Sequence, residues 1–194
     1  MKLVSPESVG MSADSLAHIG NLMRERYVEP GKIAGTSTLV ARGGQVCYFE
    51  QEGQMDRERG TEMADDTIFR IYSMTKPITS VAAMLLFEQG KFQLDDPVSM
   101  YLPKFESQRV LLDSESTDFS QTRERTADIT VRHLLTHTSG LGSRSSRLYR
   151  ENSVRDRNIT LDQMVDNAAR VPLFHDPGTE FRYGIHATII GKLI

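Results

Sequence analysis

The sequence has a single cysteine, Cys47, among 194 residues, so it forms neither an internal disulfide nor a cysteine-rich metal site. It contains no apolar run long enough to span a membrane, and its first residues include no apolar core of signal-peptide length. The formal net charge of −3 gives no reason to expect nucleic acid or a membrane surface as a partner. These absences, with 39% hydrophobic and 25% charged residues, favour a globular cytoplasmic protein.

The most informative segment is the tetrapeptide Ser73-Met74-Thr75-Lys76, which opens the apolar run 77–87. This run predicts a helix, and positions i and i+3 of a helix are neighbours, so the Ser73 hydroxyl and the Lys76 amine can converge as nucleophile and base. The start of a helix also offers unpaired N–H groups and the positive end of the helix dipole, which stabilise an oxyanion. The segment therefore favours an acyl-transfer site.

The tetrapeptide alone also fits a simpler interpretation, in which Ser73 caps a helix and Lys76 is solvated. The run 77–87 lacks a polar face, however, which predicts a helix buried in the middle of a domain. A lysine in the first turn of a buried helix destabilises the fold, because its charge loses solvation, unless it is paired or functional. This context favours the catalytic interpretation.

Periodicity and turn signals predict the other elements of the chain. Before Ser73 we expect a helix capped by Ser12, a hairpin of 33–41 and 46–49 around Gly43-Gly44, and a polar loop at 53–66. The Ser73 helix should end at Gly90 and be followed by a short helix with Asp96 as cap and Pro97 at its first position, a surface excursion at 106–128 and a short helix or turn at 129–135. The last part should contain a lid-like loop at 142–158, a helix with a capping box from Thr160 to about Arg170, a turn at 177–179 and an apolar helix after Tyr183.

This order predicts the front half of a larger α+β protein, because a two-stranded sheet needs more strands or a helix to cover its apolar face. We expect one partial domain over residues 1–194, with a helix and hairpin at 12–50 and a helical region bearing Ser73 at 67–194. The exposed edge of the hairpin offers unpaired backbone groups through which the chain would self-associate.

Ser73 to Pro77 resembles the first motif of the β-lactamase-related serine hydrolases, which include penicillin-binding proteins, class C β-lactamases and carboxylesterases of the same fold. The segments that agree with this family in order and spacing are 69–72, 94–97, 134–141 and 177–183. The resemblance covers about Gly10 to Ile194. It implies a β-lactamase/DD-peptidase-like α+β fold, of which this chain would lack the C-terminal strands of the antiparallel sheet.

The resemblance also implies roles for three residues. Ser73 would attack a carbonyl carbon to form an acyl-enzyme, and its N–H would supply half of the oxyanion hole. Lys76 would help to remove the serine proton, which requires a lowered lysine pKa. Tyr183 matches a tyrosine that shuttles this proton and activates the deacylating water; its simpler interpretation is a half-buried core aromatic. We expect no metal and no cofactor, and we interpret His137 as part of a packed structural turn.

One departure from the family concerns the motif Tyr-x-Asn, which here reads Tyr183-Gly184-Ile185. Ile185 therefore lacks the side-chain amide that asparagine would provide at this position. This difference favours the esterase branch, which acts on small esters, over a β-lactamase or a D-alanyl-D-alanine carboxypeptidase, which act on amides. The family's third motif would lie downstream of Ile194. A third hypothesis is therefore a truncated and catalytically silent chain, and we expect the isolated chain to be poorly folded and nearly inactive.

Overall fold

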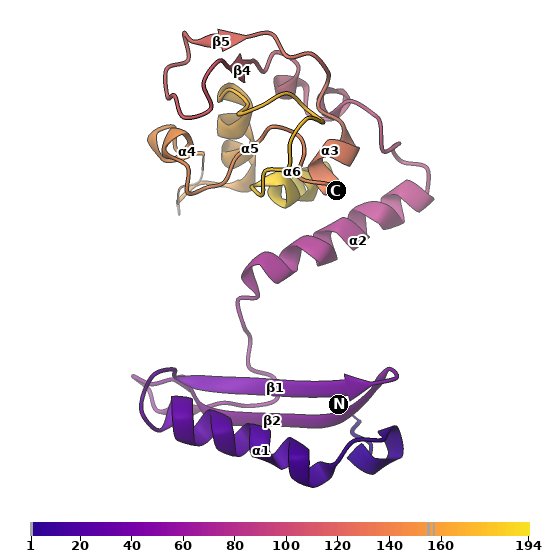
Figure 1. Ribbon diagram of the computed structural model, residues 1–194, viewed down its shortest axis with the longest axis vertical. Coiled ribbons are helices and arrows are strands. Elements are labelled where there is room, and N and C mark those ends of the chain that lie inside the picture. The colour runs from indigo at the N-terminus through magenta and orange to yellow at the C-terminus, as the bar shows by residue number, and fades with distance from the viewer. Residues whose placement is uncertain (1, 155, 157) are drawn as a thin grey trace. The chain divides into compact units, whose positions relative to one another are not determined.

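The computed structural model describes residues 2–154, 156 and 158–194 of the chain. It divides into two compact units, Met1–Arg70 and Ile71–Ile194, which are coloured indigo to magenta and magenta to yellow in Figure 1. Every residue proposed for the acyl-transfer site belongs to the second unit.

The N-terminal unit is a helix packed on an antiparallel sheet of order β1-β2-β3 (Figure 1). Its elements are α1 (Ala13–Met23), which continues as a π turn (Arg24–Val28), β1 (Gly35–Arg42), β2 (Gln45–Asp56) and β3 (Thr61–Glu62). The predicted cap is confirmed, because the Ser12 hydroxyl accepts a hydrogen bond from the Ser15 N–H at 3.2 Å. Leu16, Cys47 and Tyr48 form the small core of the unit, so Cys47 is a buried hydrophobe.

The predicted hairpin is confirmed, but its second strand is longer than expected. Gly43 and Gly44 both adopt positive φ angles, 58° and 75°, as the tight turn requires. β2 then runs through Gly53 to Asp56 and pairs with β3, where we expected a polar loop. The prediction failed because polar side chains carry no hydrophobic alternation, whereas the strand is held by backbone hydrogen bonds. A side chain at Gly53 would overlap the Ala34 carbonyl oxygen, which explains the glycine.

The C-terminal unit gathers short elements around one central helix. The central helix is α6 (His186–Leu193). The other elements of the unit are α2 (Thr75–Glu88), β4 (Val110–Leu111), β5 (Thr122–Arg123), α3 (Val131–Leu135), α4 (Arg147–Glu151) and α5 (Leu161–Arg170). The helices α2, α3 and α5 all pack against α6, on which His186, Ile189 and Ile190 are buried. The predicted capping box is confirmed, since Thr160 and Gln163 exchange both hydrogen bonds at the start of α5. Gly90, with φ of 67°, ends α2 as expected.

The prediction that α2 is a buried helix is wrong. Only Ala83 is fully buried, while Ile78, Val81 and Leu85 are 61%, 61% and 54% exposed. α6 packs against α2, and the described part of the chain leaves these three apolar side chains open to solvent. The apolar sequence of a helix shows that its faces can be buried, but which face is covered depends on the elements that pack there.

Three other segments also differ from the sequence predictions. Pro97 precedes a single 3-10 turn, Val98–Met100, and the Asp96 carboxylate accepts from the Gln93 N–H and the Tyr101 hydroxyl instead of capping a helix. The excursion at 106–128 contains the strands β4 and β5, and both residues of β4 are buried. The segment 142–158 is not a polar loop, because it contains α4, on which Leu148 and Tyr149 are buried. Residues 155 and 157 of that segment lie outside the described residues.

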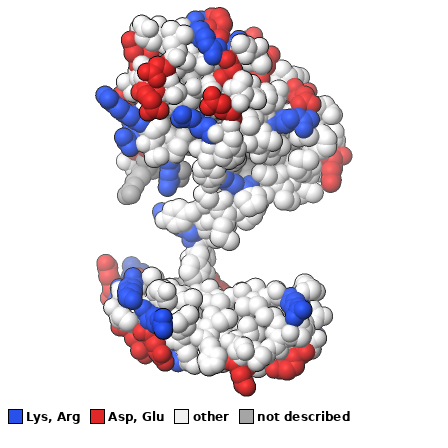
Figure 2. Space-filling view, viewed as in Figure 1, with Lys and Arg blue, Asp and Glu red and all other residues white. Residues whose placement is uncertain are grey.

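Lysine, arginine and acidic side chains are interspersed on the face of the C-terminal unit shown in Figure 2. Several of them form ion pairs within this unit, among them Lys104 with Asp166, Arg132 with Asp95 and Arg147 with Glu151. None of the helices in the described ranges combines the length and the apolar character that crossing a membrane would need.

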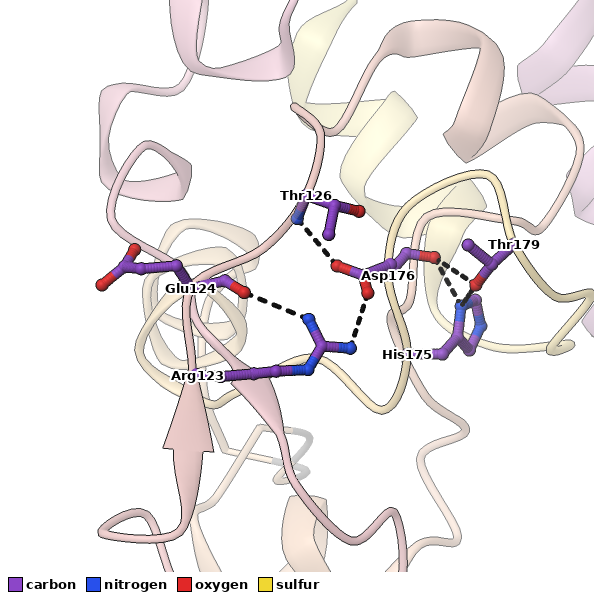
Figure 3. Close-up of polar contacts among 6 residues, drawn as sticks. All are labelled: Arg123, Glu124, Thr126, His175, Asp176 and Thr179. Atoms are coloured by element: carbon purple, nitrogen blue, oxygen red, sulfur yellow. Dashed lines mark hydrogen bonds and ion pairs between the residues drawn. The ribbon is translucent and has the colours of Figure 1, made fainter.

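Asp176 joins β5 to the loop that precedes Tyr183 (Figure 3). Its carboxylate accepts hydrogen bonds from the Arg123 guanidinium at 2.6 Å and from the Thr126 N–H at 2.8 Å. The same loop is closed by the Thr179 hydroxyl, which donates to the Asp176 carbonyl oxygen at 2.8 Å. The hydrogen bond from Arg123, with smaller contributions from Thr126 and the arginine charge, lowers the pKa of Asp176 from 3.8 to about 2.

The lowered pKa predicts that Asp176 stabilises the fold only above acidic pH. A carboxyl group with a lower pKa in the folded state contributes stability above its unfolded pKa, and that contribution is lost as the pH falls from about 4 towards 2. We expect Asp176→Asn to lower the free energy of unfolding at pH 7 by on the order of 2 kcal/mol. Urea denaturation of both proteins between pH 7 and pH 2 measures this difference, which should shrink as the pH falls.

The exposed Glu180 of the same loop provides the control, and Glu180→Gln should change stability by less than about 0.5 kcal/mol. An equal loss from Asp176→Asn and Glu180→Gln would contradict a specific role for the Asp176 carboxylate.

Candidate active site

Ser73 and Lys76 meet at the start of α2, as the spacing of the tetrapeptide predicts. Ser73 lies in a 3-10 turn, Tyr72–Met74, and Lys76 lies in the first turn of the helix that follows. The Lys76 Nζ atom is 3.2 Å from the Ser73 Oγ atom, within hydrogen-bonding distance. Ser73 is exposed and Lys76 is half-buried, so the hydroxyl is accessible to a substrate.

Tyr72, immediately before Ser73, has a φ of 46°, which is unusual for a residue with a side chain. Such a conformation costs about 1–3 kcal/mol and persists where the surrounding structure enforces it, commonly at functional sites. The turn at Tyr72 thus sets the direction in which the backbone enters α2 and presents Ser73.

Tyr183 joins the pair from the other end of the chain, in the segment just before α6. The Lys76 Nζ atom lies 4.6 Å from the centre of the Tyr183 ring, within the range of a cation–π contact. Hydrogen bonding from Lys76 and from Ser73, together with the positive charge of the lysine, lowers the pKa of Tyr183. The structure thus brings together all three residues singled out in the sequence.

A cavity of about 470 Å³ lies over these residues. Besides Ser73, Lys76 and Tyr183, its lining includes Arg144 and Ile185. The described lining contains no carboxylate to balance the charges of Lys76 and Arg144. A cavity of this character favours negative charge that develops on a bound molecule.

Backbone hydrogen bonds hold the segment of Tyr183 against the segment after α3. The Arg182 N–H donates to the His137 carbonyl oxygen at 2.9 Å, and the Ile185 N–H donates to the Gly142 carbonyl oxygen at 3.2 Å. Between them, Gly184 lies so close to Gly142 that a Cβ atom would overlap the Gly142 carbonyl oxygen. The two segments therefore approach at a distance that only glycine allows.

His137, to which the sequence analysis gave no part in the site, lies against Tyr183. The two rings are stacked, with their centres 4.9 Å apart and their planes at 26°. The Nδ1 atom of His137 is 2.9 Å from the Nδ1 atom of His186, in the first turn of α6. No spacing or periodicity links a histidine at 137 to residues 183 and 186, so the sequence carried no signal for this contact.

Residues 2–154, 156 and 158–194 contain no group of three or more histidine, cysteine, aspartate or glutamate side chains arranged to hold a metal ion. The side chains that line the cavity offer several hydroxyls, the Lys76 amine, two phenols and the Arg144 guanidinium. A nucleophile, proton carriers and positive charge are the components of an acyl-transfer site.

The chain is similar to known proteins over most of its length. The Beta-lactamase family profile matches residues 22–194, and the chain belongs to this family. Esterase EstB of Burkholderia gladioli is 31% identical over 98% of this chain and 48% of its own length. Two similar solved structures are EstCE1, described as a hydrolase with promiscuous acyltransferase activity, and the simvastatin synthase LovD of Aspergillus terreus.

EstCE1 is 34% identical, with a TM-score of 0.77 over 93% of this chain and 46% of its own. LovD in its unliganded form is 30% identical, with a TM-score of 0.73 over 94% of this chain and 48% of its own. The chain has the mixed helix and sheet of this β-lactamase and penicillin-binding-protein fold, and it spans about half the length of these relatives.

Proposed function

We propose that this chain carries the nucleophilic part of a serine hydrolase that cleaves small carboxylic esters through an acyl-enzyme on Ser73. The observation that carries the proposal is the placement of the Lys76 amine, 3.2 Å from the Ser73 hydroxyl and 4.6 Å from the centre of the Tyr183 ring. A serine hydroxyl is a weak nucleophile unless a neighbouring base takes its proton. Lys76 and Tyr183 are the two groups positioned to do so.

In the first half of the reaction, the Ser73 Oγ atom forms a bond to the ester carbonyl carbon. Its proton passes to Lys76 and Tyr183, whose amine and phenol lie close enough together to share it. The tetrahedral intermediate collapses as the bond between the carbonyl carbon and the alcohol oxygen breaks. The pair returns the proton to the leaving alcohol, and the acyl group remains on Ser73.

In the second half, water takes the place of the alcohol. The pair accepts a proton from the attacking water, the bond between the acyl carbon and Ser73 Oγ breaks, and the proton returns to the serine. The carboxylic acid is released. Both tetrahedral intermediates carry a negatively charged oxygen. This oxygen is stabilised by the Ser73 N–H at the start of α2 and by the positive charges of Lys76 and Arg144.

Ile185 supports esters over amides as substrates. It is buried at 4% exposure, lines the cavity two residues after Tyr183, and offers no side-chain hydrogen bond to a substrate amide. The similarity to Esterase EstB and to the hydrolase EstCE1 points in the same direction.

We expect a short-chain nitrophenyl ester to be hydrolysed at least about tenfold faster than a chromogenic cephalosporin, because a polar site that lacks a partner for an amide discriminates by this order. Parallel absorbance assays of the 194-residue chain measure both rates. Faster cleavage of the cephalosporin would support a β-lactamase instead.

Adding a simple alcohol to the assay tests for acyl transfer. Formation of a new ester in place of the acid would indicate transfer of the acyl group to the alcohol, an activity included in the description of EstCE1.

A further inference from the structure

The ring of His137 is held on three sides. Tyr183 stacks on its face, the ring of Phe181 meets it edge-on with centres 5.8 Å apart at 63°, and His186 binds its Nδ1 atom at 2.9 Å. Aromatic pairs in these geometries stabilise each other beyond the effect of the area that they bury. The ring therefore has a single well-defined orientation.

The backbone of His137 is as constrained as its ring. Its φ of 58° is in the left-handed region, and its carbonyl oxygen accepts the Arg182 N–H at 2.9 Å. The residue next to Tyr183 is thus tied to His137 by the main chain, while Tyr183 itself is tied by its ring. Two attachments to adjacent residues leave the tyrosine segment little freedom to rotate.

His186 anchors this arrangement to α6. Its side chain is fully buried, and burial, together with the neighbouring His137, lowers its pKa to about 3. Burial and the charge of Lys76 also lower the pKa of His137. Both rings are neutral near pH 7, so one Nδ1 donates a proton and the other accepts it. A neutral pair can remain in the interior without the cost of a buried charge.

Tyr183, by contrast, has an exposed fraction of 48%. An exposed phenol would sample several rotamers on its own. The lowered pKa of its phenol results from the hydrogen bonds with Lys76 and Ser73, so it is lost when the hydroxyl moves away from them. Of the described residues, His137 is the one whose ring stacks on Tyr183, and it is not part of the cavity lining.

We propose that His137, held by His186, is a positioning residue that fixes the Tyr183 phenol beside Lys76 and Ser73. This role rests on the proposed function for its effect on rate, whereas its effect on the phenol is independent of it. His137 does not line the cavity, so it acts through Tyr183 and not on the substrate.

The test replaces the ring but keeps the backbone. Asparagine tolerates a positive φ, so His137→Asn removes the stacked ring with little strain. We expect the maximal rate of Ser73 labelling by a fluorophosphonate to fall about 10- to 100-fold, because small displacements of a catalytic group have effects of this size. The concentration for half-maximal rate should change less than about twofold, because substrate contacts are unaffected.

Two variants separate positioning from folding. His137→Phe keeps a ring against Tyr183 but loses the contact with His186 and is strained at a positive φ, so it should recover only part of the labelling rate lost in His137→Asn. His133→Ala removes an imidazole that closes the capping box of α3 but does not contact Tyr183, and it should lower stability with little change in rate. Equal losses of rate from His137→Asn and His133→Ala, in proportion to their losses of stability, would overturn the proposal.

A double-mutant cycle tests whether His137 acts through the phenol. Tyr183→Phe should itself slow labelling about 10²-fold, and adding His137→Asn should then have less than about a twofold effect. The same further loss in both backgrounds would contradict the proposal.

A spectroscopic titration of Tyr183 works without any catalytic activity. In protein labelled with ¹³C at the tyrosine ring carbons, Tyr183→Phe identifies the Tyr183 signal, and His137→Asn should raise its pKa towards the ordinary value. An unchanged pKa in the folded variant would overturn the positioning role. If native protein shows the expected titration but no labelling of Ser73, the proposed function fails while the positioning role stands.

Discussion

Replacing Ser73 with alanine will abolish covalent labelling of this chain by a fluorophosphonate probe. The probe reacts with an activated serine hydroxyl, and Ser73 is the serine whose Oγ atom lies 3.2 Å from a lysine amine. If the described residues assemble an activated serine, intact mass should show a single adduct on the native chain and none on Ser73→Ala, whereas the catalytically silent chain that the sequence also allows would give no adduct on either. Hydrolysis of a nitrophenyl ester should fall at least about 10³-fold, which is typical for loss of a nucleophile.

Ser80, in the same helix, provides a matched control for this substitution. It does not line the cavity, so Ser80→Ala should label at the native rate. An adduct on Ser73→Ala would show that another residue is the nucleophile. A folded native chain that forms no adduct would contradict the assembly of an activated serine by the described residues.

Replacing Lys76 with methionine will have the second largest effect. Methionine preserves most of the length of the side chain but removes the amine, so the contact with Ser73 and the charge over the Tyr183 ring are both lost. We expect the labelling rate at pH 7 to fall by about 10²–10⁴-fold, the contribution of a positioned base. Lys91→Met, which removes an exposed lysine, should leave the rate unchanged.

The pH dependence of the same variant gives an independent readout. Lys76 lowers the pKa of Tyr183, so the phenolate forms at lower pH in the native chain than in free tyrosine. Without the lysine, the pKa of Tyr183 should rise towards 10.0, and the remaining activity should increase only at correspondingly higher pH. A pH profile identical to that of the native chain would contradict coupling between Lys76 and Tyr183.

Contacts within one or two helical turns follow from the sequence, whereas contacts between distant segments do not. The contact between Ser73 and Lys76 follows from local geometry, since one helical turn separates them. The helices opened by Ser12 and Thr160 also follow from local capping signals. The position of Tyr183 came from a resemblance in its motif, because nothing in its own neighbourhood indicates that it approaches Lys76.

Contacts that join distant segments were not predicted. Asp176 binds Arg123 across 53 residues, and His137 binds His186 across 49. The apolar residues of α2 predicted burial on all sides, yet Ile78 and Val81 are exposed. The polar residues at the end of β2 predict a loop, although Gly53 to Asp56 is a strand. Each error concerns a property that depends on what packs against the segment, which no local pattern records.

The sequence by itself indicated the family of this chain through motifs spread along it. It also determined the starts of helices capped by Ser12 and Thr160 and the contact between Ser73 and Lys76, because these depend on residues within one or two helical turns. Only the tertiary structure decided that Tyr183 lies over Lys76, that His137 stacks behind it and that a cavity opens above Ser73. The physical reason is that those contacts arise from α6 packing against the helices around it, and the free energy of that packing is distributed over side chains far apart in the sequence.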